Sequence, residues 1–327
     1  MVALASAPYR AGERPAVTPR APDPATATAT ATARMMGGTV LVQLLDAGDP
    51  DELEVAATRI LRRIEAWASR LTRFEPVSEL SRLNASPLAR VPVGPTLTAV
   101  LDWARTAEAS TDGLVDVALL DARLEAETGV RPDGLLPASR RWSLDRHARG
   151  ATVRREPGLR LDLDGVAKGW LADRALDIAP ARSALVDADG DVAARVVPGD
   201  TWAIGIADPR DAGARLGVLE LVADDTATPR RFGVATSGTS IHRWVHPAGA
   251  AHHLIDPWTG RSAATDVVQA TVLAGTARAA EAYAKAAVIL GSDRAFAALD
   301  RPGVHGWLLL TERGEVRASE GMLRWLA

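Results

Sequence analysis

The chain has 327 residues, of which 47% are hydrophobic and 24% are charged, with a formal net charge of −3. This composition is typical of a globular enzyme, and the chain has no cluster of basic and aromatic residues that would indicate a nucleic-acid partner. The absence of cysteine excludes disulfides, cysteine-ligated zinc and thiol catalysis. No apolar run approaches the roughly 18 residues of a membrane span, and the first residues lack the apolar segment of a secretory signal. We therefore expect a cytoplasmic protein.

Lysine is almost absent, because Lys168 and Lys285 are the only lysines among 38 basic residues. A codon bias accounts for arginine wherever only charge and solubility matter. On that reading, the two remaining lysines mark places that need a compact ammonium rather than a guanidinium fork.

Residues 1–34 are rich in Pro, Ala, Thr and Arg and contain the run ATATATATA. Such a segment has almost no large apolar side chains to bury, so we predict a disordered tail. Its arginines and few acids leave an organelle-targeting address as the alternative. The folded domain is then expected over residues 35–327, beginning near Met36.

The expected elements mix strands and helices in no regular order. In chain order they are a strand over 37–46, helices over 52–71 and 95–110, strands over 142–145, 151–155 and 159–164, a helix over 167–179, strand pairs between 184 and 238, a helix over 278–290, and a C-terminal hairpin that turns at Arg313–Gly314. Without regular βαβ alternation, the pattern favours an α+β fold.

Two polar segments interrupt the first half of this pattern. The segment RFEPVSELSRLNAS follows the first helix, and taken alone it is better explained by an exposed capping loop than by a functional site. In STDGLVDVALL, Asp116 stands in an apolar run, where a buried carboxylate needs a partner or a polar ligand. A surface-facing position on a half-buried strand is the alternative for Asp116.

The segment LRLDLDGVAKGWLADRAL predicts an anion site. Asp162 and Asp164 alternate with leucines, which puts both on one face of a strand. The strand ends at Gly165, and Lys168 lies in the first turn of the following helix, where free N–H groups and the helix dipole attract phosphate. A structural helix cap is the alternative, and the missing GxGxxG pattern argues against a dinucleotide-binding Rossmann fold.

A loop rich in histidine, GVATSGTSIHRWVHPAGAAHHLIDPWTGRSA, contains His253 and Asp256, which we predict to be a base and its orienting acid. The histidines lack a zinc-ligand spacing such as HExxH, and the serines lack the GxSxG pattern of serine hydrolases.

Taken in this order, the motifs SELSRLN, TDGLVD, LDLDGVAKG, VATSG and HLIDPWTG resemble those of the ApbE family of FAD:protein FMN transferases, from about Met36 to the C-terminus. The resemblance implies a T-fold-like α+β architecture of mixed sheets packed with helices. It also implies a magnesium-dependent reaction in which FAD is cleaved, AMP is released, and FMN is attached through a phosphoester to a Thr or Ser of a target flavoprotein with an FMN-binding domain. The alternatives are an FAD-binding protein without transferase activity and an FAD pyrophosphatase that yields FMN and AMP.

The resemblance assigns roles to residues of this chain. His253 corresponds to the family's general base, while Phe74 stands where the family often has tyrosine. The positions that correspond to FAD contacts are Met36, Phe74, Leu114, Val115, Asp116, Asp162, Lys168 and Leu254.

The metal site departs from the family pattern. On the late helix the family has A-D-A-x-x-T, where this chain has Glu281 at the acid and Lys285 at the threonine. The backbone carbonyl of Gly165 completes the implied ligand set. A charged lysine has no acceptor and cannot ligate magnesium. We therefore expect the Lys285 ammonium to take over part of the cation's role, held by Glu281, although an ordinary i,i+4 helix pair also explains the spacing.

Overall fold

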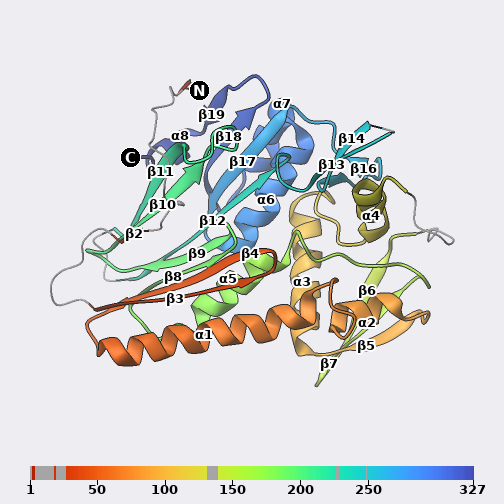
Figure 1. Ribbon diagram of the computed structural model, residues 1–327, viewed down its shortest axis with the longest axis horizontal. Helices are drawn as coiled ribbons and strands as arrows, with labels where there is room; N and C mark the ends of the chain where they lie inside the picture. The colour runs from red at the N-terminus through yellow and green to blue at the C-terminus, as the bar shows by residue number, and fades with distance from the viewer. Residues whose placement is uncertain (1, 4–17, 20–26, 131–138, 225–227, 248) are drawn as a thin grey trace.

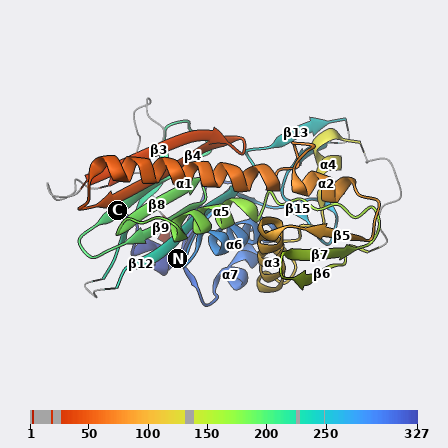
Figure 2. The same cartoon turned by 90° about the horizontal axis from the view of Figure 1, so that it is seen from below.

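The computed structural model describes residues 2–3, 18–19, 27–130, 139–224, 228–247 and 249–327. A nine-stranded antiparallel sheet forms the body, with long helices on one face and a smaller sheet on the other (Figures 1 and 2). The predicted α+β class is confirmed. None of the helices in the described ranges is both long and apolar enough to cross a membrane.

The secondary structure comprises eight helices and nineteen strands over these ranges. The helices are α1 Pro50–Leu71, α2 Glu79–Ala85, α3 Pro95–Ser110, α4 Leu120–Thr128, α5 Ala167–Asp177, α6 Ala277–Leu290, α7 Ser292–Leu299 and α8 Glu320–Leu323. The strands are β1 Val2–Ala3, β2 Thr18–Pro19, β3 Ala27–Met35, β4 Gly38–Asp46, β5 Arg90–Val93, β6 Trp142–His147, β7 Gly150–Arg155, β8 Ser183–Ala188, β9 Val192–Val196, β10 Thr201–Ala207, β11 Arg215–Val222, β12 Arg230–Gly238, β13 Arg243–His246, β14 Gly249–His252, β15 Ile255–Asp256, β16 Arg261–Ser262, β17 Val267–Ala274, β18 Val304–Thr311 and β19 Val316–Ala318.

The main sheet has the order β1-β19-β18-β17-β12-β9-β8-β4-β3. Helices α1, α5 and α6 pack on one face, where α1 covers β3 and β4, α5 covers β8 and β9, and α6 covers β12 and β17. Strands β10 and β11 cover the other face around the fully buried side chains of Trp202 and Phe232. The predicted C-terminal hairpin is confirmed as β18 and β19, joined by the turn at Arg313–Gly314.

The prediction of a disordered tail is wrong for Ala27–Arg34, which form most of β3 and pair with β4 along its whole length. The alternation of Ala and Thr has the two-residue period of a strand. It turns small alanines such as Ala29 (5% exposed) toward α1 and leaves the threonines on the outer side. Threonine is β-branched and favours extended backbone, so a segment without large apolar residues still forms an edge strand. Folded structure therefore begins before Met36.

A second region packs α2 and α3 against the three-stranded sheet β5-β7-β6. The strand predicted over residues 159–164 is wrong, because no strand among the described residues pairs with this segment. Instead, the side-chain amide of Asn84 both donates to the carbonyl of Leu161 and accepts from its N–H, each at 2.8 Å. Asn84 of the SELSRLN motif thus makes the two backbone hydrogen bonds that a neighbouring strand would make, and these bonds keep the segment extended.

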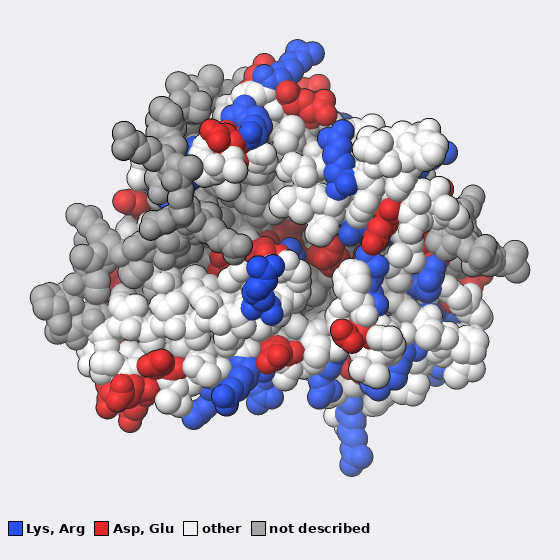
Figure 3. All heavy atoms as spheres, viewed as in Figure 1, with Lys and Arg blue, Asp and Glu red and all other residues white. Residues whose placement is uncertain are grey.

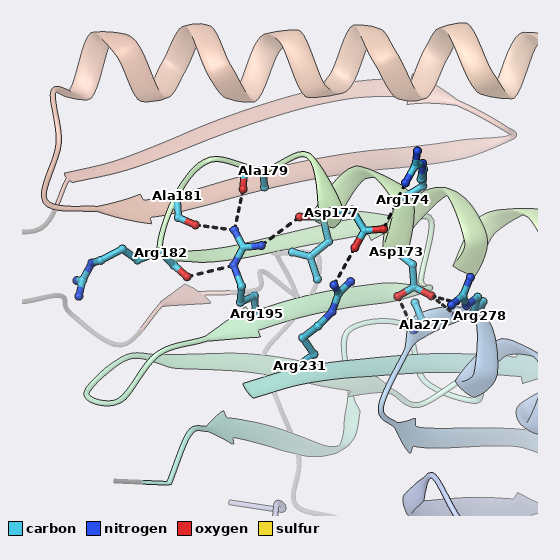
Figure 4. Close-up of polar contacts among 11 residues, drawn as sticks. Asp173, Arg174, Asp177, Ala179, Ala181, Arg182, Arg195, Arg231, Ala277 and Arg278 are labelled. Carbon is cyan, nitrogen blue, oxygen red and sulfur yellow. Dashed lines mark hydrogen bonds and ion pairs between the residues drawn. The ribbon is translucent and has the colours of Figure 1, made fainter. Parts of the chain in front are cut away.

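Buried polar contacts fix α5 relative to α6 (Figure 4). Asp173 on α5 accepts hydrogen bonds from the N–H groups of Ala277 and Arg278 at 3.0 and 3.1 Å, which caps the first turn of α6. At the other end of α5, Arg195 donates to the carbonyls of Ala179 and Ala181. The contacts of Asp173 place the N-terminus of α5 beside the middle of α6, where Gly169 N–H donates to Glu281 and the candidate site lies.

Candidate functional site

Two neighbouring cavities lie where the main body meets the second region. The first, here called the inner pocket, is lined by Leu114, Asp116, Leu119, Arg123, Asp162, Asp164, Gly165, His253, Ile255 and Lys285. The second, here called the arginine cleft, measures about 730 Å³ and is lined by Arg105, Glu108, Asp116, Ser139, Arg140, Arg141, Trp142, Ser143, Arg154 and Arg155. Asp116 borders both cavities. In Figure 3, acidic and basic side chains gather in a hollow near α6.

The inner pocket unites residues from three separate motifs. The leucines Leu159, Leu161 and Leu163 are buried, which turns Asp162 and Asp164 away from the core as the predicted alternation requires. Burial and the neighbouring Asp164 raise the pKa of Asp162. Burial opposes ionisation of Asp164 as well, but Lys168, Lys285 and other cations outweigh it and hold the pKa of that carboxyl below its ordinary value.

Lys168 lies in the first turn of α5, as predicted. Besides Asp164, its carboxylate neighbours include acids from residues 184–197, which the sequence predicted only as a strand pair. The end of β8 carries Asp187, and the turn to β9 carries Asp189 and Asp191. These three acids are here called the acidic turn, and Asp189 Oδ2 lies 3.8 Å from Lys168 Nζ. Burial lowers the pKa of Lys168, yet Asp191, Asp164 and Asp189 raise it above its ordinary value overall. The run DADGD was the signal in the sequence.

The acidic turn contains carboxyl groups that resist ionisation. Burial raises the pKa of Asp187 to about 6 and that of Asp191, which is 4% exposed, to about 7. Lys168 opposes both shifts. A cluster with this many acids around few cations therefore keeps some of them protonated near neutral pH.

The N-terminus of α5 already has a carboxyl partner, and this partner comes from the protein itself. Glu281 Oε2 accepts a hydrogen bond from Gly169 N–H at 3.0 Å. A Cβ at residue 169 would clash with the backbone of Arg278, so glycine permits this close approach of α5 and α6. Glu281 is 4% exposed, its pKa is raised by burial and by Asp191, and its Oε1 has no hydrogen-bond partner in the described structure.

His253 lines the inner pocket at the end of the β13–β14 hairpin. Its backbone N–H donates to the carbonyl of His242 at 3.1 Å, and the two imidazole rings meet edge to face with centroids 5.3 Å apart. His253 Nδ1 is buried and has no partner among the described residues. Asp256 instead accepts from Trp258 N–H at 2.9 Å, and no hydrogen bond in the described ranges joins Asp256 to His253. The predicted pair of base and orienting acid is therefore not formed here.

Arg123 is a pocket residue that sequence reasoning missed. It lies on α4, which was not predicted, and is only 5% exposed. Its Nη2 is 3.8 Å from Asp164 Oδ2 and its guanidinium lies 4.9 Å from the ring centroid of Trp244, whereas Nε and Nη1 lack hydrogen-bond partners within the described residues. Burial lowers its pKa. A buried guanidinium with unused donors is well suited to bind an anion.

The remaining predicted FAD contacts have varied surroundings. Leu114 lines the inner pocket, while the side chains of Val115 and Leu254 are 3% and 1% exposed and pack into the core. Met36 occupies the β3–β4 turn with a positive φ of 57°. Phe74 is 72% exposed, lines neither cavity, and has the Arg73 guanidinium 4.2 Å from its ring centroid.

Asp116 connects the two cavities through its neighbours. Its Oδ1 accepts from Ala118 N–H at 2.8 Å and its Oδ2 lies 3.4 Å from Arg140 Nε. Burial raises the pKa of Asp116. Because Arg140 also donates to the carbonyl of Pro257 at 2.6 Å, it holds the HLIDPWTG segment against the arginine cleft.

Comparison with known proteins identifies the family of the chain. The sequence pattern of the ApbE family matches residues 36–308. The FAD:protein FMN transferase of Treponema pallidum is 33% identical over 182 residues, covering 51% of this chain and about half (48%) of that protein, and that of Salmonella typhimurium is 25% identical over 305 residues, covering 86% and 82%. The apo form of the Pseudomonas stutzeri flavinyl transferase ApbE has a TM-score of 0.72 at 20% identity, covering 92% of this chain and 97% of that one. The chain belongs to the ApbE family.

Proposed function

We propose that this chain is an FAD:protein FMN transferase that attaches FMN, through a phosphoester, to a Thr or Ser hydroxyl of a target flavoprotein with an FMN-binding domain. The observation that carries the proposal is the inner pocket, where His253 with an unpartnered Nδ1 lines the same space as Arg123 and Lys285. A base and anion-binding cations in one pocket are what phosphoryl transfer to a hydroxyl requires. The curated relatives that match this chain carry this activity in their names.

In this reaction the target hydroxyl oxygen attacks the FMN phosphorus of FAD. A new phosphorus–oxygen bond forms, the phosphoanhydride bond to the AMP half breaks, and its electron pair leaves on the AMP phosphate. His253 accepts the hydroxyl proton, since a neutral imidazole is a suitable base near pH 7. Lys168, Lys285 and Arg123 offset the negative charge of the phosphates.

The arginine cleft offers room for the part of FAD that extends beyond the inner pocket. Its volume of about 730 Å³ is in the range of ligand sites, and Trp142 and several arginines line it. Asp116, which borders both cavities, is a proposed FAD contact, as are Asp162 and the backbone of Leu114 and Val115. The cytoplasmic location stays a prediction from the sequence.

Incubation of the chain with FAD and a purified FMN-binding domain that carries an acceptor Thr or Ser tests the proposal. Covalent flavin fluorescence on the acceptor in a denaturing gel, with one AMP released for each FMN attached, supports transfer. Release of free FMN and AMP without labelling identifies a pyrophosphatase. Bound FAD that stays intact identifies a binding protein without transferase activity.

A further inference from the structure

Lys285 lies one helical turn after Glu281 on α6, and its ammonium reaches the glycine turn that precedes α5. A Cβ added at Gly165 would fall in the place of Lys285 Nζ, so the ammonium lies directly against the backbone at residue 165. Glycine is the residue that leaves this space free. Lys285 also lines the inner pocket together with Asp164 and His253.

This donor set does not fit a magnesium ion. Magnesium takes oxygen ligands in near-octahedral geometry, whereas an ammonium has three donors and no acceptor. Glu281 already accepts from Gly169 N–H with one of its two oxygens. The described part of the chain contains no group of three or more His, Cys, Asp or Glu side chains placed to hold a metal ion. At the position implied for a metal ligand, this chain therefore has a cation of its own.

The surroundings suit a fixed cation. Burial is the largest influence on Asp164, Asp191 and Glu281 and favours their protonated forms, while the positive charge of Lys285 acts on all three in the opposite direction. Glu281 lies one turn before it, but no ion pair within 4.0 Å joins the two side chains in the described structure. The expectation that Glu281 holds Lys285 directly is therefore not met; the Gly165 turn and the acids around it define the ammonium's place.

We infer that the Lys285 ammonium takes the place of a divalent metal ion, binding the FAD pyrophosphate beside the Gly165 turn, so that FMN transfer needs no metal. This inference rests on the proposed function for the identity of the phosphate ligand. Lys285 offsets the charge that builds on the AMP phosphate as the phosphoanhydride bond breaks, a stabilisation that does not depend on an ion from solution.

The first experiment measures FMN transfer by the full chain after metal removal, in EDTA and in magnesium chloride. We expect equal rates in the two conditions. A rate that falls on the order of 10²-fold in EDTA and returns with magnesium would overturn the inference.

The second experiment uses Lys285→Thr, which restores a hydroxyl at the position, and Lys285→Met, which keeps the length of the stem without the charge. We expect both variants to fold, as judged by their melting temperatures, and to lose transfer in EDTA on the order of 10²-fold. Magnesium should restore transfer in the threonine variant more than in the methionine variant. Either variant transferring in EDTA at the wild-type rate contradicts a role for the ammonium.

A third readout does not depend on transfer. Titration with Mn²⁺, followed by electron paramagnetic resonance, should show binding to Lys285→Thr and none to the wild type at the same concentrations. Tight Mn²⁺ binding by the wild type that is lost in Glu281→Ala would overturn the inference. If no acceptor is labelled under any condition, the proposed function fails, while the Mn²⁺ result still decides what occupies the place beside Gly165.

Discussion

The inner pocket and the arginine cleft share Asp116 but use their cations differently. In the arginine cleft most of the buried guanidinium donors have partners: Arg105 donates to the carbonyl of Trp142 at 2.9 Å, Arg154 pairs with Asp145, and Arg155 donates to three backbone carbonyls and leaves only its Nε without a partner in the described structure. In the inner pocket Arg123 leaves two of its nitrogens without partners in the described structure, and Lys285 lies against backbone.

This difference separates binding from chemistry. Cations that are already paired and partly exposed contribute modest, salt-sensitive attraction. Buried groups with unused donors or acceptors are costly to maintain, and such groups gather where a ligand or a reaction uses them. We therefore assign phosphoryl transfer to the inner pocket and the holding of the distal part of FAD to the arginine cleft.

The strongest test of this assignment is His253→Ala. We expect the transfer rate to fall by about 10² to 10⁴-fold, the usual contribution of a general base. The FAD affinity should stay nearly unchanged, because His253 Nδ1 has no hydrogen-bond partner that the substitution would leave unpaired. The neighbouring His252, whose Nε2 lies 3.1 Å from the carbonyl of Ala263, provides the matched control. His252→Ala should lower the melting temperature and leave the transfer rate of the folded protein nearly unchanged. Equal losses of rate in both variants would contradict the role of His253.

Arg123→Met should weaken FAD binding on the order of 10- to 100-fold, the loss expected for charge-assisted hydrogen bonds to phosphate. Methionine fills the space of the buried stem, and replacing a buried charge by an apolar group of similar size is often neutral for stability. Titration of flavin fluorescence and a melting curve measure the two effects. Arg160→Met, which removes the partner of Asp121 on the same helix without touching the pocket, should leave FAD affinity unchanged. Loss of stability with unchanged affinity would make Arg123 a structural residue.

Much of the body could be predicted from the sequence, because apolar periodicity determines which face of a long element is buried. The helix predicted over residues 95–110 agrees with α3 in both bounds. The prediction of a disordered tail failed at Ala27–Arg34. The small alanine side chains bury too little apolar surface to stabilise the segment by themselves, and pairing with β4 supplies the missing stability. Only the sheet partner, invisible to local pattern, makes that segment a strand.

The inner pocket was predicted in part. Local motifs pointed to Asp162, Lys168 and His253, since each stands in a polar interruption of an apolar pattern. Arg123 was not predicted as a pocket residue, because α4 is only weakly amphipathic and a single arginine among 36 has no distinguishing pattern in the sequence. The acidic turn was not predicted for a related reason. Acids are common in hairpin turns, and only the folded chain brings these acids close to Lys168.

Asp191→Asn tests the electrostatics of the inner pocket through stability. A carboxyl whose pKa rises from about 4 unfolded to about 7 folded contributes stability that is complete below pH 4 and is lost as the pH rises through 7. Asparagine does not ionise, so between pH 5 and pH 8 the free energy of unfolding of the variant should rise relative to that of the wild type by roughly 2–3 kcal/mol, since each unit of pH up to the folded pKa is worth about 1.4 kcal/mol. Urea unfolding at pH 5 and pH 8, at constant ionic strength, measures the gain. A difference that is the same at both pH values would mean that Asp191 ionises normally in the folded protein.

The smallest effect is expected in the arginine cleft, from Arg140→Met. The Arg140 side chain is 41% exposed and pairs with Asp116 at 3.4 Å, so its contribution to FAD affinity should be about two- to fivefold and should fade at high salt. Arg146→Met is the matched control, because Arg146 pairs with Asp102 on the surface and lines neither cavity. The transfer rate at saturating FAD should stay unchanged in both variants, since neither arginine lines the inner pocket. If Arg140→Met lowers the transfer rate at saturating FAD as much as Arg123→Met does, the two cavities act as one catalytic site. The assignment of phosphoryl transfer to the inner pocket and of FAD binding to the arginine cleft is then wrong.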